Sequence, residues 1–195
     1  MTTSKRVTAL VPWGGVPSSG TALVCFPWAG AGATPFRVWG PVLGGTAAVY
    51  GVRLAGRESR QTEPPATALD ALVAELVRDL AALDEPHVAL FGQCSGGLLA
   101  FAVARALCRT GVGPEVMHLL VASQLPPRVV ADSPVESGPD LVHYVDEGLR
   151  EEPEILEVLL PILAADMALI ADYAYAPGEP LDVPLTVFYG ADDAL

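Results

Sequence analysis

The sequence predicts an α/β fold, with a mostly parallel sheet covered by helices on both faces. Short segments with the apolar character of strands alternate with segments of helical spacing, a rhythm typical of parallel sheets. The predicted strands are apolar along their whole length, which indicates that both of their faces are buried. The composition agrees, because 51% of the residues are hydrophobic and only 17% are charged, which argues against disorder.

The first half of the chain supplies three of the expected strands. We expect residues 1–20 to form an irregular lead-in rich in Pro, Gly and Ser. Leucine and valine then recur every three or four residues from position 67 onward, which predicts a helix with Thr67 and Asp70 in a capping-box variant. The remaining elements expected here are a helix at about 34–43 and strands at 21–26, 47–52 and 87–91.

The second half breaks the rhythm after a helix that ends at Gly111 and a strand at 117–122. Residues 132–176 contain no predicted strand but two helices, at 140–149 and 154–175, and Pro161 is expected to kink the second or to start a new helix. A helical insertion of this length predicts a lid over the site, with ordinary crossover helices as the alternative. A final strand is expected at 184–189, and residues 1–195 form one domain.

Charge and cysteine usage exclude several classes of protein. The net charge of −12 disfavours nucleic acid or an anionic membrane as a partner. The three cysteines are too widely and irregularly spaced for a disulfide framework or a metal site, and we expect Cys25 and Cys108 in the core. We see no signal peptide and no apolar run long enough to cross a bilayer, so a cytoplasmic location is expected.

The strongest motif is the turn Gly92-Gln-Cys-Ser-Gly96, between a predicted strand and a predicted helix. Gly-x-nucleophile-x-Gly in this context is a nucleophile elbow, in which the N–H after the nucleophile helps to form an oxyanion hole. The central residue is Cys94 rather than serine. A helix N-terminus is expected to lower the pKa of such a thiol. The alternative is a glycine-rich turn that happens to hold a buried cysteine.

Further motifs accompany the elbow in a characteristic order. With these motifs the chain resembles the type II (editing) thioesterases of polyketide and nonribosomal peptide synthesis, which are α/β-hydrolases, from about residue 20 to the last residue. The motifs are Phe26-Pro-Trp-Ala-Gly30, Leu54-Ala-Gly-Arg57, Leu90-Phe-Gly-Gln-Cys-Ser-Gly-Gly97, Leu159-Leu-Pro-Ile-Leu-Ala-Ala-Asp166 and Gly190-Ala-Asp-Asp193.

The resemblance implies a role for several residues. Cys94 would be the nucleophile, and the backbone N–H groups of Ala29 and Ser95 would form the oxyanion hole. Asp193 would be the triad acid, with Asp192 as the alternative. The substrate would be an acyl group on the phosphopantetheine of an acyl or peptidyl carrier protein, with no cofactor and no metal. Trp28 and Gln93 are the candidate substrate-binding residues; Trp28 either lines the acyl pocket or only packs under the lid, and the family commonly has histidine at the position of Gln93.

The catalytic histidine of the family has no counterpart at the expected place. His87 should lie at the far end of its strand, and His118 lies within a strand. His143 lies on a predicted lid helix, and it is the only one of the three that could swing over the site. We therefore expect the chain to be a C-terminally incomplete form of a longer domain, with the last strand, the histidine and the last helix missing. In that case the strand at 184–189 would be an exposed sheet edge.

Three functions remain open from the sequence. The first is hydrolysis or transfer of carrier-bound acyl groups through Cys94, since a cysteine acyl-enzyme stays activated as a thioester. The second is a catalytically inactive protein that binds acyl chains or carrier domains, and the third, a lipase-like esterase, is disfavoured by the Phe-Pro-Trp-Ala-Gly loop. Arg53, Arg57 and Arg60 either meet a phosphate of phosphopantetheine or are solvated loop charges.

Overall fold

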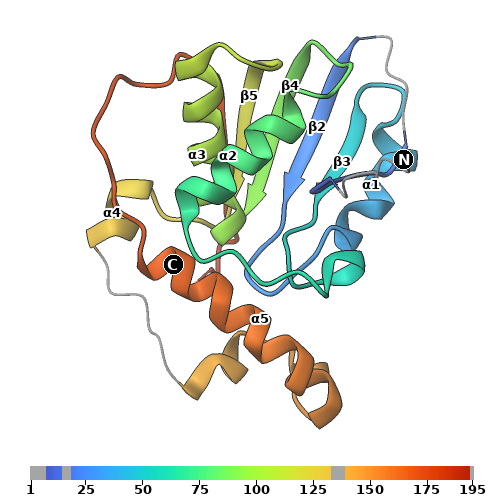
Figure 1. The fold of residues 1–195 in the computed structure, drawn as a ribbon, viewed down its shortest axis with the longest axis vertical. Coiled ribbons are helices and arrows are strands. Elements are labelled where there is room, and N and C mark those ends of the chain that lie inside the picture. Colours follow the sequence, from blue (N-terminus) through green and yellow to red (C-terminus); the bar gives the residue numbers. More distant parts are fainter. Residues whose placement is uncertain (1–7, 15–18, 133–138, 194–195) are drawn as a thin grey trace, which may run out of the picture.

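The sheet has six strands in the order β1-β3-β2-β4-β5-β6 (Figure 1). The computed structural model describes residues 8–14, 19–132 and 139–193. β1 is antiparallel to β3, and all other neighbours are parallel, which confirms the mostly parallel sheet. The strands are β1 (Leu10–Pro12), β2 (Thr21–Phe26), β3 (Ala48–Val52), β4 (His87–Gln93), β5 (Glu115–Ala122) and β6 (Leu185–Phe188).

Helices cover both faces of the sheet. In Figure 1, α2 and α3 lie on the face toward the viewer, and the short α1 lies beside β3. No helix among the described residues combines the length and apolarity needed to cross a membrane. The α-helices are α1 (Trp39–Leu43), α2 (Leu69–Leu80), α3 (Ser95–Thr110), α4 (Pro127–Asp132) and α5 (Pro153–Ala171). The 3-10 helices are η1 (Thr34–Val38), η2 (Glu58–Arg60), η3 (Pro139–Tyr144) and η4 (Glu147–Leu149).

Alternate side chains of the central strands enter two separate apolar cores. Val24 and Leu90 are fully buried in the larger core, which α2 and α3 complete. Cys25 and Phe91 point the other way and pack with Phe36. This alternation is the period of a strand with both faces buried, and it explains why the strands are apolar throughout.

The N-terminal half departs from the predicted elements in two places. Residues 10–12 form β1 at the sheet edge, where an irregular lead-in was expected. The capping box of Thr67 and Asp70 does not form, because the N-cap residue of α2 is Ala68 and no side chain caps it. α2 is instead held by its apolar face, on which Leu72, Leu76 and Leu80 are buried.

Other expectations fail in the second half of the chain. The helix predicted at 140–149 is two short 3-10 turns, η3 and η4. Pro161 does not start a new helix, because α5 runs without interruption from Pro153 to Ala171 with the proline exposed on its surface, and the alternative of a kink at Pro161 stays a prediction. Cys108 lies on the exposed side of α3 rather than in the core, whereas Cys25 is buried as expected.

α5 crosses below the carboxyl ends of the parallel strands (Figure 1). It packs against the loop after β2: a Cβ built on Gly30 would lie 3.4 Å from Leu159 and 3.5 Å from Leu163. The segment that was predicted as a lid is therefore seated at the edge of the sheet where ligands of parallel sheets bind. Whether it opens and closes stays a prediction.

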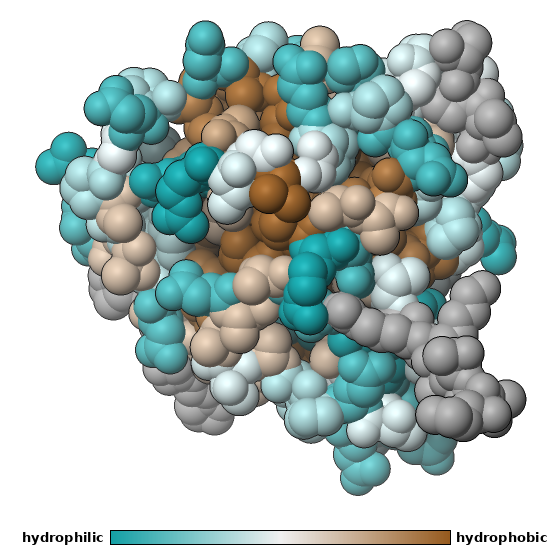
Figure 2. All heavy atoms as spheres, turned by 45° about the horizontal axis from the view of Figure 1, so that its top comes forward, coloured by the Kyte–Doolittle hydropathy of each residue, from teal (hydrophilic) through white to brown (hydrophobic). Residues whose placement is uncertain are grey.

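The last strand, β6, is the outer edge of the sheet beyond β5. Its apolar residues are largely exposed; Leu185 is 60%, Val187 53% and Phe188 48% accessible. Figure 2 shows, on one face of the molecule, hydrophobic residues in a hollow among hydrophilic ones. An apolar edge strand with unpaired backbone groups is a site for association with other chains.

Candidate active site

Cys94 sits in a strained turn between β4 and α3. Its backbone has φ 51° and ψ −129°, a conformation that costs a non-glycine residue free energy and persists only where the surroundings impose it. Two hydrogen bonds impose it here: the Cys94 N–H donates to the Ala122 carbonyl at 2.8 Å, and the Gly97 N–H donates to the Cys94 carbonyl at 2.7 Å. This geometry is that of a nucleophile elbow.

The two glycines of the motif are required by close backbone approach. A Cβ on Gly92 would lie 2.3 Å from the Gly96 carbonyl oxygen. A Cβ on Gly96 would lie 2.3 Å from the Phe26 oxygen and 2.5 Å from the Pro27 oxygen. Gly96 thus lets the first turn of α3 rest directly on the loop that follows β2, which brings the predicted oxyanion residues of the two segments together.

Ala29 and Ser95 carry the two predicted oxyanion donors. Ala29 lies in the loop after β2, and Ser95 is the first residue of α3. The Ser95 N–H lies close enough to the Cys94 sulfur to act on its ionisation, and no hydrogen bond of the Ala29 N–H is found among the described residues. Free N–H groups near a helix N-terminus are suited to hold a developing negative charge.

The pKa of the Cys94 thiol is raised, contrary to the expected lowering. The main cause is desolvation of the sulfur by the surrounding segments, which disfavours the thiolate although the Cys94 side chain is still accessible to solvent. The Ser95 N–H acts in the opposite direction, and the negative charge of Asp193 adds to the rise. The helix N-terminus therefore stabilises the thiolate as reasoned, but desolvation outweighs it.

Asp193 is the acidic residue whose charge reaches Cys94. It follows β6 in a turn closed by a hydrogen bond of 3.2 Å from its N–H to the Gly190 carbonyl. Asp192 is exposed in the same turn, and its charge does not act on the Cys94 thiol. Asp193 is exposed as well, and its role as the triad acid, with Asp192 as the alternative, stays a prediction.

The three histidines lie elsewhere. His87 begins β4, at the strand end opposite Cys94, and pairs with Glu115 at 3.6 Å. The Nε2 atom of His118 lies 2.8 Å from the Thr186 hydroxyl, between β5 and β6. His143 is exposed in η3. The predicted nucleophile, oxyanion donors and acid stay predictions, and no histidine is among the groups that act on the ionisation of the Cys94 thiol.

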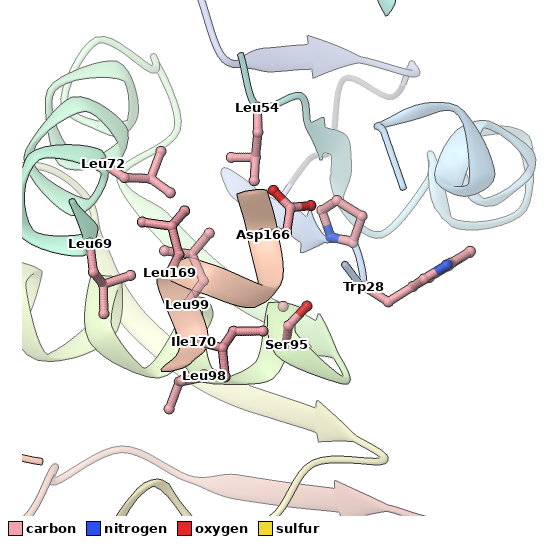
Figure 3. A pocket seen from close by; sticks show the side chains of 12 residues that line it. Trp28, Leu54, Leu69, Leu72, Ser95, Leu98, Leu99, Asp166, Leu169 and Ile170 are labelled. Carbon is pink, nitrogen blue, oxygen red and sulfur yellow. The ribbon is translucent and has the colours of Figure 1, made fainter. Parts of the chain in front are cut away.

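A cavity of about 40 Å³ lies beside the elbow. Figure 3 shows leucines of α2 and α3 on one side of it, and Ser95 and Trp28 near its other end. Trp28 is 37% exposed and lines the cavity. Gln93, the other predicted substrate-binding residue, is half-buried at the end of β4 and does not line it.

Asp166 is the site residue that sequence reasoning missed. From α5 it enters the rim of the cavity and accepts a hydrogen bond of 2.8 Å from the Gly30 N–H. Arg57 donates two hydrogen bonds to the same carboxylate and a third, of 2.9 Å, to the Ala31 carbonyl. The available signal was a lone Asp at the end of a largely apolar helix stretch.

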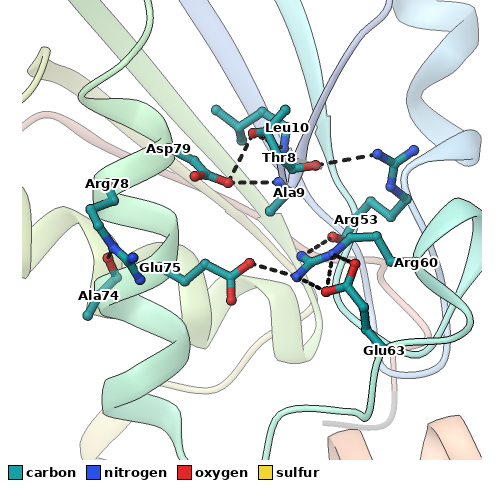
Figure 4. Close-up of polar contacts among 10 residues, drawn as sticks. All are labelled: Thr8, Ala9, Leu10, Arg53, Arg60, Glu63, Ala74, Glu75, Arg78 and Asp79. Atoms are coloured by element: carbon teal, nitrogen blue, oxygen red, sulfur yellow. Dashed lines mark hydrogen bonds and ion pairs between the residues drawn. The ribbon is translucent and has the colours of Figure 1, made fainter. Parts of the chain in front are cut away.

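The arginines after β3 are neither solvated loop charges nor free to bind a phosphate. Arg57 and Arg60 are each only 5% exposed. Arg60 pairs with Glu63 and Glu75 (Figure 4), and Arg53 reaches the Thr8 carbonyl at 3.4 Å. Both alternatives considered for Arg57 and Arg60 are therefore wrong, because the two guanidinium groups are buried in ion pairs that fix the loop after β3.

The comparison with known proteins decides the family. Residues 21–195 match the family described as "Thioesterase domain". The chain belongs to the thioesterase domain family. Among relatives of this thioesterase, the gramicidin S biosynthesis protein GrsT of Aneurinibacillus migulanus is 30% identical over 181 residues, which are 88% of this chain and 70% of GrsT.

Solved structures agree with the fold and the family of this thioesterase. RedJ, from the prodiginine pathway of Streptomyces coelicolor, is 32% identical with a TM-score of 0.77, over 88% of this chain and 74% of RedJ. BorB, a type II thioesterase from the borrelidin cluster, is 26% identical with a TM-score of 0.78, over 96% of this chain and 80% of BorB. The predicted resemblance to type II thioesterases is confirmed.

Proposed function

We propose that this thioesterase removes or transfers acyl groups held as phosphopantetheine thioesters on acyl or peptidyl carrier proteins, in natural-product biosynthesis. The similarity to GrsT, a gramicidin S biosynthesis protein, and to BorB, a type II thioesterase of the borrelidin cluster, supports the pathway. The observation that carries the chemistry is the strained elbow, which presents the Cys94 sulfur beside the Ser95 N–H.

The reaction begins with attack of the Cys94 sulfur on the thioester carbonyl carbon. A new carbon–sulfur bond forms, and the carbonyl oxygen becomes an oxyanion held by the N–H groups of Ala29 and Ser95. When the oxyanion collapses, the bond to the pantetheine sulfur breaks, and that sulfur takes up the proton lost by Cys94. The acyl group is then a thioester of Cys94, with Asp193 orienting the base that moves the proton.

The cysteine affects the second step. A thioester of Cys94 is as activated as the substrate thioester, so an amine or alcohol competes with water for the acyl group. The cavity beside the elbow is lined mainly by leucines and other apolar residues, which favours an apolar acyl chain. The test is product analysis in the presence of added amines or alcohols. If free acid is still the sole product, acyl transfer is rejected.

Intact-mass analysis with an acyl-pantetheine thioester tests the nucleophile. The wild-type protein should gain the mass of one acyl group, and Cys94→Ala should gain none. Cys108→Ala is the matched control, since Cys108 is also exposed but lies outside the site. A gain that survives Cys94→Ala and disappears in Cys108→Ala would refute Cys94 as the nucleophile.

A second candidate function is a catalytically inactive protein that binds acyl chains or carrier proteins. The positions of His87, His118 and His143 favour it, because none of them activates Cys94. The same experiment separates the two functions. Saturable binding of acyl-pantetheine, with no mass gain on Cys94, would support the binding protein and count against the enzyme.

A further inference from the structure

A buried ion pair connects the oxyanion loop to α5. Asp166 of α5 accepts a hydrogen bond of 2.8 Å from the Gly30 N–H, although the two residues are 136 positions apart. Arg57 donates to both carboxylate oxygens, at 2.7 Å to the Oδ2 atom that also accepts from Gly30 and at 2.6 Å to Oδ1, and it donates at 2.9 Å to the Ala31 carbonyl. The Arg57 and Asp166 side chains are only 5% and 9% exposed, so these bonds form away from competing water.

The Gly30 N–H belongs to the peptide unit that directly follows Ala29. Fixing that unit limits the rotation of Ala29, whose own N–H is the proposed oxyanion donor. The start of the loop is fixed too, because Gly96 lies against the Phe26 and Pro27 carbonyls. A turn closed by the Ala31 N–H on the Trp28 carbonyl, at 3.0 Å, joins the two fixed points. Ala29 is thus held from both sides.

The charge of Arg57 makes this arrangement compatible with the reaction. A carboxylate beside the oxyanion hole would by itself oppose the negative charge that forms there. The bidentate guanidinium neutralises Asp166 and fixes the direction in which its oxygens point. Asp166 can therefore accept the Gly30 N–H without adding net charge near the reacting carbonyl.

We infer that Arg57 and Asp166 are positioning residues: together they orient the Ala29 N–H toward the oxyanion, and that donor is aligned only while α5 is seated on the loop. This role rests on the proposed function of Cys94. It makes α5 a part of the oxyanion hole as well as a wall of the acyl cavity.

A trifluoromethyl ketone analogue of acyl-pantetheine tests the role. The Cys94 sulfur forms a bond to the ketone carbon, the C=O π bond breaks, and the thiol proton passes to the ketone oxygen. The resulting hydroxyl lies in the oxyanion hole and releases its proton to solvent when the pH exceeds its pKa. Nothing leaves, so the adduct is stable. Fluorine NMR as a function of pH gives the amount of adduct and the pKa of its hydroxyl. A thioether analogue without the carbonyl measures binding that does not use the oxyanion hole.

Asp166→Ala removes the acceptor for Gly30, and Asp166→Asn keeps one. We expect Asp166→Ala to weaken adduct formation about 10- to 100-fold, less than loss of a whole donor, and to raise the pKa of the adduct hydroxyl, with thioether affinity unchanged. Asp166→Asn should restore part of both. Glu75→Gln, which breaks the Arg60–Glu75 pair of 2.8 Å away from the loop, is the matched control and should change neither. If Asp166→Ala does not fold, Arg57→Lys loosens the same carboxylate and should show the same direction of change.

The outcomes separate the two proposals. If every variant forms as much adduct as the wild-type protein, with the same hydroxyl pKa, the positioning role is overturned and Cys94 remains the nucleophile. A parallel loss of adduct and thioether affinity would also overturn it, since that pattern indicates general damage to the site. Absence of any adduct on the wild-type protein would overturn the proposed function, and the positioning role with it.

Discussion

Arg57 and Asp166, 109 positions apart in the chain, form a bidentate ion pair with N–O distances of 2.6 and 2.7 Å in the interior of the protein. Each residue belongs to a motif that identifies the family in sequence, and the structure shows that the two motifs are in direct contact. The pair therefore contributes to the stability of the fold independently of any part in catalysis.

Arg57→Met should lower the free energy of unfolding by about 3–5 kcal/mol, because it leaves the Asp166 carboxylate buried without its partner. Urea denaturation followed by circular dichroism measures the change. Arg37→Met is the control: Arg37 is exposed in η1, and its replacement should stay within about 0.5 kcal/mol. Equal effects of the two substitutions would contradict a structural role of the pair.

Gly96→Ala should both destabilise the protein and abolish acylation of Cys94. The new Cβ would meet the Phe26 and Pro27 carbonyls at 2.3 and 2.5 Å, so the oxyanion loop must move away from α3. Overpacking of this kind costs about 1–3 kcal/mol. Gly45→Ala meets nothing within 4 Å and should leave stability and acylation unchanged. Thermal unfolding and intact mass provide the two readouts.

The alkylation rate of Cys94 should depend on pH and on Asp193. Because burial and the Asp193 charge raise the pKa of the Cys94 thiol, the thiolate fraction is small at neutral pH and grows as the pH rises. Asp193→Asn removes one cause of the rise, lowers the pKa, and should speed alkylation by iodoacetamide at neutral pH. The whole rate profile should shift toward lower pH.

Peptide mapping separates the three cysteines in that experiment. Cys25 should stay unmodified in the folded protein, because it is fully buried and its pKa is strongly raised. Cys108 is exposed but not affected by Asp193, so its rate should be the same in wild type and Asp193→Asn. A change at Cys108 equal to that at Cys94 would indicate a global rather than a local effect.

Added imidazole should accelerate acylation of Cys94. No histidine of the chain acts on the thiol, so a diffusible base can supply the missing proton transfer. The initial rate of mass gain should rise with imidazole concentration at constant pH and ionic strength. N-Ethylmorpholine, a bulkier base of comparable basicity, controls for access to the site. A rate independent of imidazole would mean that acylation needs no further base.

Val187→Lys should reduce aggregation of the protein. Val187 is 53% exposed on β6 at the edge of the sheet, and a lysine on an edge strand disfavours pairing with another chain. Val42→Lys adds the same charge at a more exposed position on α1, so it controls for charge alone. Light scattering measured at increasing protein concentration gives the degree of aggregation of each variant. Equal aggregation of the two variants would argue against association through β6.

The sequence predicted the sheet and the elbow because both have short-range causes. Strands such as β2 and β4 are continuous apolar runs, and the Gly92–Gly96 spacing specifies the turn locally. β1 was missed because three residues carry too little pattern. Thr67 was assigned as part of a cap from its residue type alone, whereas the start of α2 is set by packing of its leucines.

The parts of the site that depend on contacts between distant segments could not be predicted in the same way. Arg57 lies in a charged stretch, and nothing near it in sequence indicates that α5 will bury it. The pKa of Cys94 was predicted to fall because the helix N-terminus is visible in the sequence. The burial that outweighs it comes from the surrounding segments and appears only in three dimensions.

The long sequence separation between the oxyanion loop and Asp166 of α5 has a consequence for folding order. The acceptor of the Gly30 N–H, Asp166, is synthesised 136 residues later. Bringing two such distant segments together is slow compared with local helix formation. A nascent chain can therefore complete β2, β4 and the elbow while its Ala29 donor is still free to rotate. The reactive thiol is present before the oxyanion hole is assembled, and α5 is the last of these elements to be made.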